Sequence, residues 1–380
     1  YWHLPVNDDA TSLLHNTLDP DLPTEAIYES DIDPARSAGG LDLGGGDPCL
    51  FFDYSPRTGI QRMPGQVIRS CGDIQDPEEK EGVERFEVDL HYSLLIDKRT
   101  DLYLADTIPI AFQRVTRDGW KGVNAFGISG SDNYDAYLSS ADNIRIDVVR
   151  ADGGREQLLR EPRNLPVLSL VTYVDPGNRG LYEMKWRQLP FEHYEVRRFD
   201  GAVSTFLPCN SSAVWCYLTG YRSPQGEELK FERGTARRLM SLTSPHQHSV
   251  HLSYDERGRI AAATDSNGRI VRYGYDAGNR LVTVTYPSGE VCHYDYDDAQ
   301  HLLAFSVSPD GKTSPQVLMR NEYLNGVLTR QTLADGSVYE YSYTYDPANR
   351  QQMIGATVHT PDGRSFDVNM KDWASVVHER

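Results

Sequence analysis

Apolar and polar residues alternate in short runs along most of this chain. Residues 86–90 place Phe, Val and Leu at every second position between acidic residues, and residues 144–149 show the same period of two. Such a period puts alternate side chains on the two faces of a β-strand. Further apolar runs at 168–174, 182–186, 194–199 and 203–207 extend the pattern. We therefore predict a β domain over residues 86–230.

The first 85 residues follow no such period. Pro20, Pro23, Pro34, Pro48 and other prolines recur through them, together with the glycines of 39–40 and 44–46. Proline removes a backbone donor and glycine weakens any regular element, so long helices are excluded. We expect residues 1–85 to form an irregular arm or plug.

Tyrosine-aspartate pairs recur at a nearly fixed interval in the last third of the chain. Successive motif tyrosines at 254, 275, 296, 323 and 345 are separated by 21, 21, 27 and 22 residues. A period of this length is typical of a repeat array in which each unit needs its neighbours for stability. We place the array at residues 231–380. Its candidate structural residues are Tyr254, Asp255, Gly258, Tyr275, Asp276, Asn279, Tyr296, Asp297, Tyr345 and Asp346.

Each repeat also carries a second turn signal near its middle, as in Asn267-Gly268 and Asp335-Gly336. These pairs accept positive φ at little cost, which tight hairpin turns require. Two turns per repeat predict two short strands, and therefore stacked antiparallel hairpins. In residues 338–345, alternation puts four tyrosines on one face, where stacked hairpins would align their rings.

The spacing and the form Tyr-Asp-x-x-Gly-Arg-Ile of residues 254–260 resemble the YD repeats of the RHS family. That family includes bacterial polymorphic toxins, the C subunits of insecticidal toxin complexes and the extracellular part of teneurins. Residues 98–110, Arg114 and residues 126–128 are similar to the domain that precedes the repeats in bacterial members. The resemblance implies an all-β fold in which the hairpins form a curved or spiral sheet, here a partial shell. It further implies a bacterial protein, secreted or on the cell surface, whose partners are other parts of a longer parent chain or a toxin cargo.

Composition narrows the choice of partners. The formal net charge is -17, which argues against nucleic acid and anionic membranes as partners. No run approaches the roughly 20 apolar residues that span a bilayer, so no membrane span is expected.

The five cysteines allow two pairs and one remainder. Cys209 and Cys216 flank a short turn-like segment and could close a small loop, and Cys49 could pair with Cys71. This would leave Cys292 alone in a strand. Five unpaired thiols are the alternative.

Candidate chemistry is sparse. His246 and His248, with His251, form the strongest metal candidate, because the first two would share a strand face. Asp19 with Asp21, Asp31 with Asp33, and Asp295, Asp297 and Asp298 could offer oxygen ligands to calcium, although ordinary turn roles are the simpler reading. No nucleophile elbow, P-loop or dinucleotide fingerprint is present, and we predict no catalytic residue, cofactor or metal.

Three functions remain open. The first is a non-catalytic scaffold, part of a shell used in toxin delivery or cell contact. The second is an adhesin-like module that binds surface carbohydrate or protein, for which the candidates are Trp2, Trp120, Trp186, Trp215 and Trp373, although most of these could be core residues. Separately, Asn210 matches a glycosylation acceptor. The third is a hydrolase whose site is assembled from distant residues, which a buried cleft joining two carboxylates with displaced pKa values would support.

Overall fold

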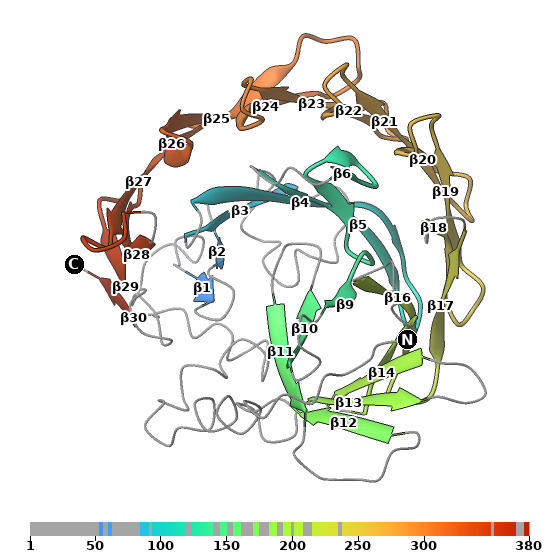
Figure 1. The fold of residues 1–380 in the computed structure, drawn as a ribbon. Helices are drawn as coiled ribbons and strands as arrows, with labels where there is room; N and C mark the ends of the chain where they lie inside the picture. The colour runs from blue at the N-terminus through green and yellow to red at the C-terminus, as the bar shows by residue number, and fades with distance from the viewer. Residues whose placement is uncertain are drawn as a thin grey trace. The chain divides into compact units, whose positions relative to one another are not determined.

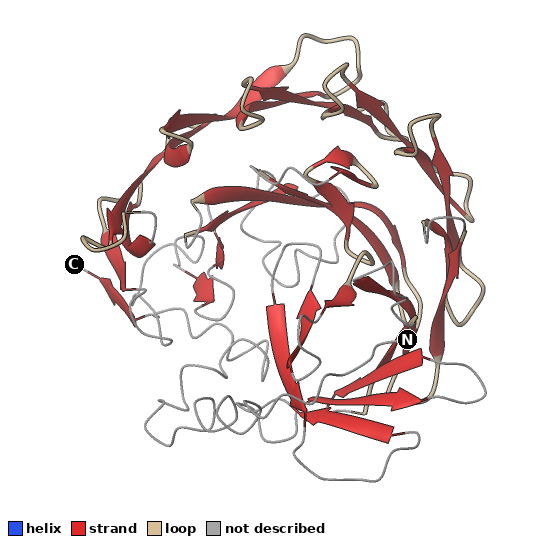
Figure 2. Cartoon of the chain, in the orientation of Figure 1, coloured by secondary structure: helices blue, strands red, loops and turns tan. Residues whose placement is uncertain are grey.

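The protein is described by a computed structural model whose regular elements are all β-strands (Figure 2). The structure describes residues 53–55, 60–62, 84–90, 93–118, 123–139, 145–149, 155–160, 170–174, 182–187, 193–198, 201–207, 215–234, 238–350, 353–369 and 376–379. The all-β prediction is confirmed. Within these residues there is no helix of the length and apolar character needed to cross a membrane.

The chain forms two compact units. The described parts of unit 1 come from Leu104–Ile110 and Asn133–His251, and those of unit 2 come from Glu29–Tyr103, Ala111–Asp132 and Leu252–Arg380. These limits differ from the domain boundaries expected at residues 85 and 230, which stay predictions.

Unit 1 is a succession of antiparallel strands. They are β9 (Tyr137–Ser139), β10 (Arg145–Val149), β11 (Arg155–Arg160), β12 (Leu170–Val174), β13 (Tyr182–Arg187), β14 (His193–Arg198), β15 (Val203–Phe206), β16 (Trp215–Arg222), β17 (Glu228–Arg233), β18 (Leu239–Thr243) and β19 (Ser249–Tyr254), the last of which continues into unit 2. Strand β9 pairs with both β10 and β16, so strands β9 to β16 close into a ring. Strand β16 then pairs through its second half with β17, where the hairpin array begins.

In unit 2 the array continues as sequential antiparallel hairpins (Figure 1). Its strands are β20 (Ile260–Asp265), β21 (Ile270–Tyr275), β22 (Leu281–Thr285), β23 (Val291–Tyr296), β24 (Leu302–Ser308), β25 (Gln316–Leu324), β26 (Val327–Leu333), β27 (Val338–Tyr345), β28 (Met353–His359), β29 (Ser365–Asn369) and β30 (Val376–Glu379). Two strands per repeat, as predicted, follow from two turns per repeat.

A second sheet of unit 2, here called the inner sheet, packs on one face of the array. Its strand order is β1-β2-β3-β4-β5-β8, with bounds Asp53–Ser55, Ile60–Arg62, Glu84–Asp89, Leu94–Leu104, Ile110–Arg117 and Gly130–Asp132. Strands β6 (Val123–Asn124) and β7 (Gly127–Ile128) form a small hairpin beside it. Between the layers, Phe86 meets Phe305 edge-on at 5.5 Å between ring centroids, and Phe126 meets Tyr273 at 4.8 Å. Such aromatic pairs bury large apolar areas and form the core of this unit.

The predicted N-terminal arm lies outside the described residues except for β1, β2 and the first two residues of β3. Strands β1 and β2 pair with each other, and β2 pairs with β3, so this part of the arm extends the inner sheet. Backbone hydrogen bonds to an open sheet edge allow a strand where the side-chain pattern predicts none.

Candidate functional site

The turn that follows each motif tyrosine is held by its aspartate. Oδ1 of Asp255 accepts hydrogen bonds from the backbone N–H groups of Arg257 and Arg259, each at 2.9 Å, while Oδ2 accepts from the Arg259 guanidinium at 2.7 Å. Burial alone would raise the pKa of Asp255, but the hydrogen bonds from Arg259 outweigh it and the pKa is lowered. Asp276 binds Arg280 in the same way, and Asp297 binds His301. Gly258, Asn279 and Gln300, just before the basic residue, all take positive φ.

The basic residue of one repeat also reaches the next repeat. Nη1 of Arg259 donates to Oδ1 of Asn279 at 2.9 Å, and its guanidinium carbon lies 4.2 Å from the centre of the Tyr275 ring. Arg280 lies over Tyr296 at 5.5 Å, and the His301 ring stacks on Tyr323 at 4.5 Å. A cation over an aromatic face is stabilising. The basic residue of each turn therefore binds the turn to the next repeat.

The motif tyrosine completes this contact. The hydroxyl of Tyr275 donates to the carbonyl of Ile260 at 2.7 Å, whereas that of Tyr323 lies 3.3 Å from the carbonyl of Leu302 and donates to Oδ2 of Asp118 at 2.7 Å. Both carbonyls belong to the residue that follows the basic residue of the preceding repeat. A register shift occurs just before Tyr275 and before Tyr296, Tyr323 and Tyr345, and such bulges re-aim a side chain. The Tyr-Asp-x-x-Gly-Arg-Ile signature is thus one contact between successive repeats.

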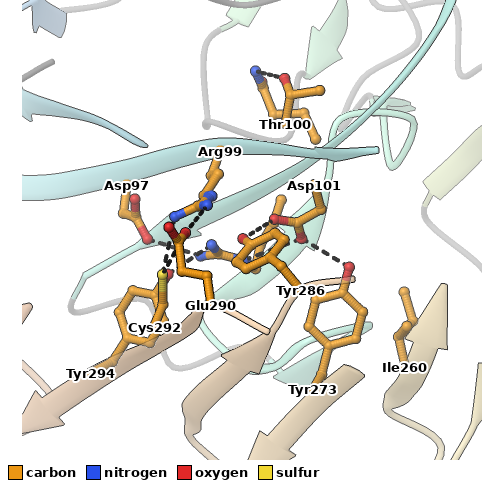
Figure 3. A network of polar contacts seen from close by, with 12 residues as sticks. Asp97, Arg99, Thr100, Asp101, Ile260, Tyr273, Tyr286, Glu290, Cys292 and Tyr294 are labelled. Carbon is orange, nitrogen blue, oxygen red and sulfur yellow. Dashed lines mark hydrogen bonds and ion pairs between the residues drawn. The ribbon is translucent and has the colours of Figure 1, made fainter. Parts of the chain in front are cut away.

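A buried polar network joins the inner sheet to the array (Figure 3). Arg114 of β5 is fully buried; its Nη1 lies 2.9 Å from Oδ2 of Asp97, and its Nε lies 3.5 Å from Oδ2 of Asp101. Nη2 of Arg114 donates to the hydroxyl of Tyr294, in β23, at 2.7 Å. Asp101 in turn accepts from the hydroxyl of Tyr273 at 2.8 Å.

Arg99 forms the second half of this network. Its Nη2 lies 2.6 Å from Oε1 of Glu290, its Nη1 donates to Sγ of Cys292 at 3.0 Å, and its guanidinium carbon lies 4.0 Å from the centre of the Tyr286 ring. The hydroxyl of Tyr286 donates to Oδ1 of Asp101 at 2.5 Å, which connects the two halves. Three carboxylates therefore face two guanidinium groups, and tyrosine hydroxyls supply further hydrogen bonds between them.

Burial displaces the protonation equilibria of the network. Burial raises the pKa of Asp101 despite the neighbouring guanidinium groups, and burial followed by the Asp101 charge raises the pKa of Tyr273 well above its usual value. A general base needs a pKa near the operating pH. These phenols stay protonated, so they serve as hydrogen-bond donors.

This network was not foreseen from the sequence. Asp97, Arg99 and Asp101 occupy alternate positions of β4, a pattern that normally indicates a solvent-facing side of a strand. In the structure all three are buried because Arg114, Tyr286 and Glu290 supply counter-charges and donors. One feature of the sequence could have indicated the network. Lys98 and Thr100, which alternate with the three charged residues, are polar as well, so neither face of this strand has the apolar side chains of an ordinary core.

The three histidines that were weighed as a metal candidate do not come together in the structure. His246 lies in a turn, His248 precedes β19 and His251 is exposed on β19, so His246 and His248 do not share a strand face. Nδ1 of His246 instead lies 2.5 Å from Oδ1 of Asp106, whose other oxygen accepts from the Ser244 hydroxyl. These residues all belong to unit 1. The hydrogen bond and the charge of Asp106 raise the pKa of His246.

Other candidate ligands also stay apart. No group of three or more His, Cys, Asp or Glu residues in the described ranges could hold a metal ion. Asp297 is engaged in its turn with His301, and Asp295 pairs in register with Ala304 within the array. The pairs Asp19–Asp21 and Asp31–Asp33 lie outside the described residues.

Cys216 of β16 is disulfide-bonded. The other cysteines weighed for pairing, Cys49, Cys71 and Cys209, lie outside the described residues. The pairing with Cys209 stays a prediction. Cys292 is buried and forms no disulfide. Trp2, Trp120, Trp373 and Asn210 are not described, nor are the side chains of Trp186 and Trp215.

Comparison with protein families matches the RHS Repeat family over residues 254–291 and 325–365. No curated protein matches the chain. Among solved structures it is similar to the TcdB2-TccC3-Cdc42 crystal structure, at 13% identity and a TM-score of 0.35, covering 87% of this chain and 20% of that one. Similar values hold for TcdB2-TccC3, at 13% identity and a TM-score of 0.30 over 76% of this chain and 17% of that one. A Photorhabdus luminescens Tc holotoxin pore structure gives 13% identity and a TM-score of 0.28 over 78% and 17%.

The chain therefore spans about a fifth of the length of the first of these structures. The two segments matched by the family contain the turns at Asp255, Asp276 and Asp346 and the hairpins β20–β22 and β26–β28. The sequence period, the hairpin array and the family match agree on these same strands. The chain carries RHS repeats over these two segments.

Proposed function

We propose that this chain is a non-catalytic scaffold, one part of an RHS-type shell that serves toxin delivery or cell contact. The observation that carries the proposal is the buried network of Asp97, Arg99, Asp101 and Arg114. It fixes a second sheet to the face of the repeat array across β21–β23. Buried ionic groups of this kind are costly unless fully paired, and they favour one arrangement of the two layers.

The absence of a catalytic role rests on how the network is occupied. Every ionised group named in it is engaged with another member, and the phenols are held in the protonated state. A reacting group would need both access to a substrate and a pKa suited to proton transfer. We therefore assign these residues to holding the two layers together.

The partners we propose are other parts of a longer parent chain or a toxin cargo, in a bacterial protein that is exported or displayed at the cell surface. The RHS repeats support this assignment. The carbohydrate-binding alternative depends on tryptophans whose side chains are not described, so it stays a prediction. A glycan array with no signal above background would exclude it.

Limited proteolysis of the protein encoded by the whole gene tests the delivery role. We expect a segment beyond the repeats to resist trypsin in the native protein and to be cut once mild denaturant opens the shell. The Arg114→Met variant should lose this protection at a lower denaturant concentration than Arg272→Met, a control on the exposed face of β21. Equal cleavage rates with and without denaturant, or a coding sequence that stops at Arg380, would overturn the cargo role.

A further inference from the structure

The strand pairing of unit 2 shifts register beside the motif tyrosines. Asp295 of β23 pairs with Ala304 of β24, and Tyr296 pairs with Leu302, so Leu303 is one extra residue between the two pairs. The pairings of β21 with β22 and of β25 with β26 show the same shift. A bulge of this kind interrupts the hydrogen-bond ladder and re-aims the groups beside it.

The first buried residue after each of the first four tyrosine turns of unit 2 is called the anchor residue here. The anchor residues are apolar and between 0% and 4% exposed, and they are Ile260, Leu281, Leu302 and Leu328. The last three of them pair directly with the motif tyrosine of their repeat, next to the register shift. A backbone N–H at so buried a position needs an acceptor.

Three of the four anchor N–H groups bond to a second layer formed by the inner sheet and the β6–β7 hairpin, here called the inner layer. The donors and their acceptors are Ile260 with the Ala125 carbonyl at 2.7 Å, Leu302 with Oδ2 of Asp118 at 3.1 Å, and Leu328 with the Ser93 carbonyl at 3.4 Å. In the repeat of Leu281 the contact is made two residues earlier, where the Asn279 carbonyl accepts from the Ile128 N–H at 2.9 Å. Four successive repeats are thus each held to the inner layer by one main-chain group, and all four contacts lie within unit 2.

The acceptors on the inner layer lie where its strands end or turn. Ser93 lies in the turn between β3 and β4, Asp118 directly follows β5, and Ala125 lies in the turn of the β6–β7 hairpin. Two of these three acceptors are main-chain carbonyls, which every residue type supplies. Contacts of this chemistry fit the turns of a second layer with little dependence on its side chains.

The anchor residues also connect successive repeats through their carbonyl groups. The carbonyl of Ile260 accepts from the Tyr275 hydroxyl at 2.7 Å, and that of Leu302 accepts from Nδ2 of Asn321 at 2.8 Å. In these two residues the N–H binds the inner layer while the C=O binds the next repeat. The anchor residue is therefore a junction of its own strand, the next repeat and the second layer.

We infer that the bulge beside the motif tyrosine is a docking device for a second layer: it turns one main-chain group per repeat out of the array's own ladder and toward a turn of that layer. This role extends the proposed scaffold function, on which it rests. Between regular antiparallel strands the same group would bond to the neighbouring strand. A buried N–H without an acceptor is destabilising, so an array built in this way is stable only with a layer on its inner face. The charged network then favours this particular sheet as that layer.

Hydrogen exchange of the whole chain, resolved to single amides by fragmentation mass spectrometry, tests the main-chain contacts. We expect the amides of Ile260 and Leu302 to exchange slowly and the exposed turn amide of Gly326 to exchange fast. Asp118→Leu removes the acceptor of Leu302 and should speed exchange of that amide roughly tenfold, with Ile260 unchanged. Tyr323→Phe removes the other donor to the same carboxylate oxygen and is the matched control, in which Leu302 should stay slow.

Deletion of Leu303, which is 38% exposed, tests the bulge itself. Without the extra residue the pairing of β23 with β24 should become regular, and the Leu302 amide should exchange at least as fast as in Asp118→Leu. Leu303→Thr keeps the residue count and should leave the exchange of Leu302 as in the wild type. A deletion variant that does not fold leaves the Asp118→Leu comparison to decide.

Two results would overturn the docking role. The first is fast exchange of the Ile260 and Leu302 amides in the wild-type chain. The second is a Leu302 amide that stays slow in Asp118→Leu. Neither result depends on protease protection of a segment beyond the repeats, so the docking role and the delivery role can fail separately.

Discussion

An aspartate, an arginine and a tyrosine act together in two regions of unit 2, and the two groups differ in their reach along the chain. In the repeat turn, Asp255 binds Arg259 four residues away, and the arginine lies over Tyr275 of the next repeat. In the buried network, Arg114 binds Asp97 across 17 residues and Tyr294 across 180. The side chains of Arg259 and Asp255 are 11% and 24% exposed, whereas those of Arg114 and Asp97 are 0% and 3% exposed.

The difference teaches what each group contributes. At the turn, water can replace a lost partner, so the ion pair adds modest stability and mainly fixes geometry. In the network no water replaces a lost partner, so removing one charge leaves its counter-charge buried and unpaired. The turn contacts determine the local geometry of each repeat. The buried network determines which sheet packs against the repeat array.

The largest expected effect comes from Arg114→Met, which leaves Asp97 and Asp101 without their buried cation. We expect the free energy of unfolding to fall by about 3–5 kcal/mol, because an uncompensated buried charge is strongly destabilising. Denaturant unfolding followed by tryptophan fluorescence would measure it. Arg272→Met, on the exposed face of β21, is the matched control, and equal losses in the two variants would contradict the role assigned to Arg114.

Gly127→Ala should have the next largest effect, at the point where the β6–β7 hairpin touches the array. Gly127 has a φ of +82°, and an added Cβ would lie 2.4 Å from the carbonyl oxygen of Asn279. Ile128 also donates to that carbonyl at 2.9 Å, so the hairpin cannot move away without losing this bond. Left-handed strain together with overpacking predicts a loss of about 2–4 kcal/mol in thermal or denaturant unfolding.

The control for this variant is Gly268→Ala, which also has positive φ but nothing within 4 Å of the added Cβ. It isolates the backbone strain from the steric clash. Similar losses in the two variants would show that the hairpin contact with Asn279 contributes little.

Arg259→Gln should cost less, because it breaks a partly exposed turn. The variant loses the ion pair with Asp255 and the cation contact with Tyr275, together about 1–2 kcal/mol. Arg257→Gln, in the same turn but exposed, should leave the unfolding midpoint unchanged. A loss as large as that of Arg114→Met would remove the distinction between the two regions.

His246→Gln should have the smallest effect, and it should depend on pH. The pKa of His246 is raised in the folded state by Asp106, with a smaller contribution from Glu227. The stabilisation is therefore fully present below the unfolded pKa of about 6.5 and is lost as pH rises through the folded pKa. The difference in melting temperature between wild type and variant should shrink from mildly acidic to alkaline buffer. A difference independent of pH would contradict the ion pair.

Local chemistry explains why the repeat could be predicted from the sequence. In the Asp255–Arg259 and Asp276–Arg280 contacts the two partners are four residues apart in the sequence. The glycines and asparagines of the turns indicate positive φ by their residue type alone. Strand alternation likewise places Tyr339 and Tyr341 on the buried face, where they are 2% and 4% exposed, whereas Tyr345, which follows a register shift, is 37% exposed. The period and the hairpins follow from interactions that a short window of sequence contains.

The tertiary structure alone decided which charges are buried and with what. In the sequence, the alternate charged residues of β4 resemble a strand face exposed to solvent. In the structure they are buried, because residues more than 170 positions away pack over them, namely Tyr273, Tyr286 and Glu290. His246 was no more than a metal candidate in the sequence, and the fold places Asp106, 140 residues away, beside it. Contacts at such separations depend on the register of two sheets, which no local pattern encodes. The sequence by itself determined the hairpin array; packing of the inner sheet determined the network that holds it.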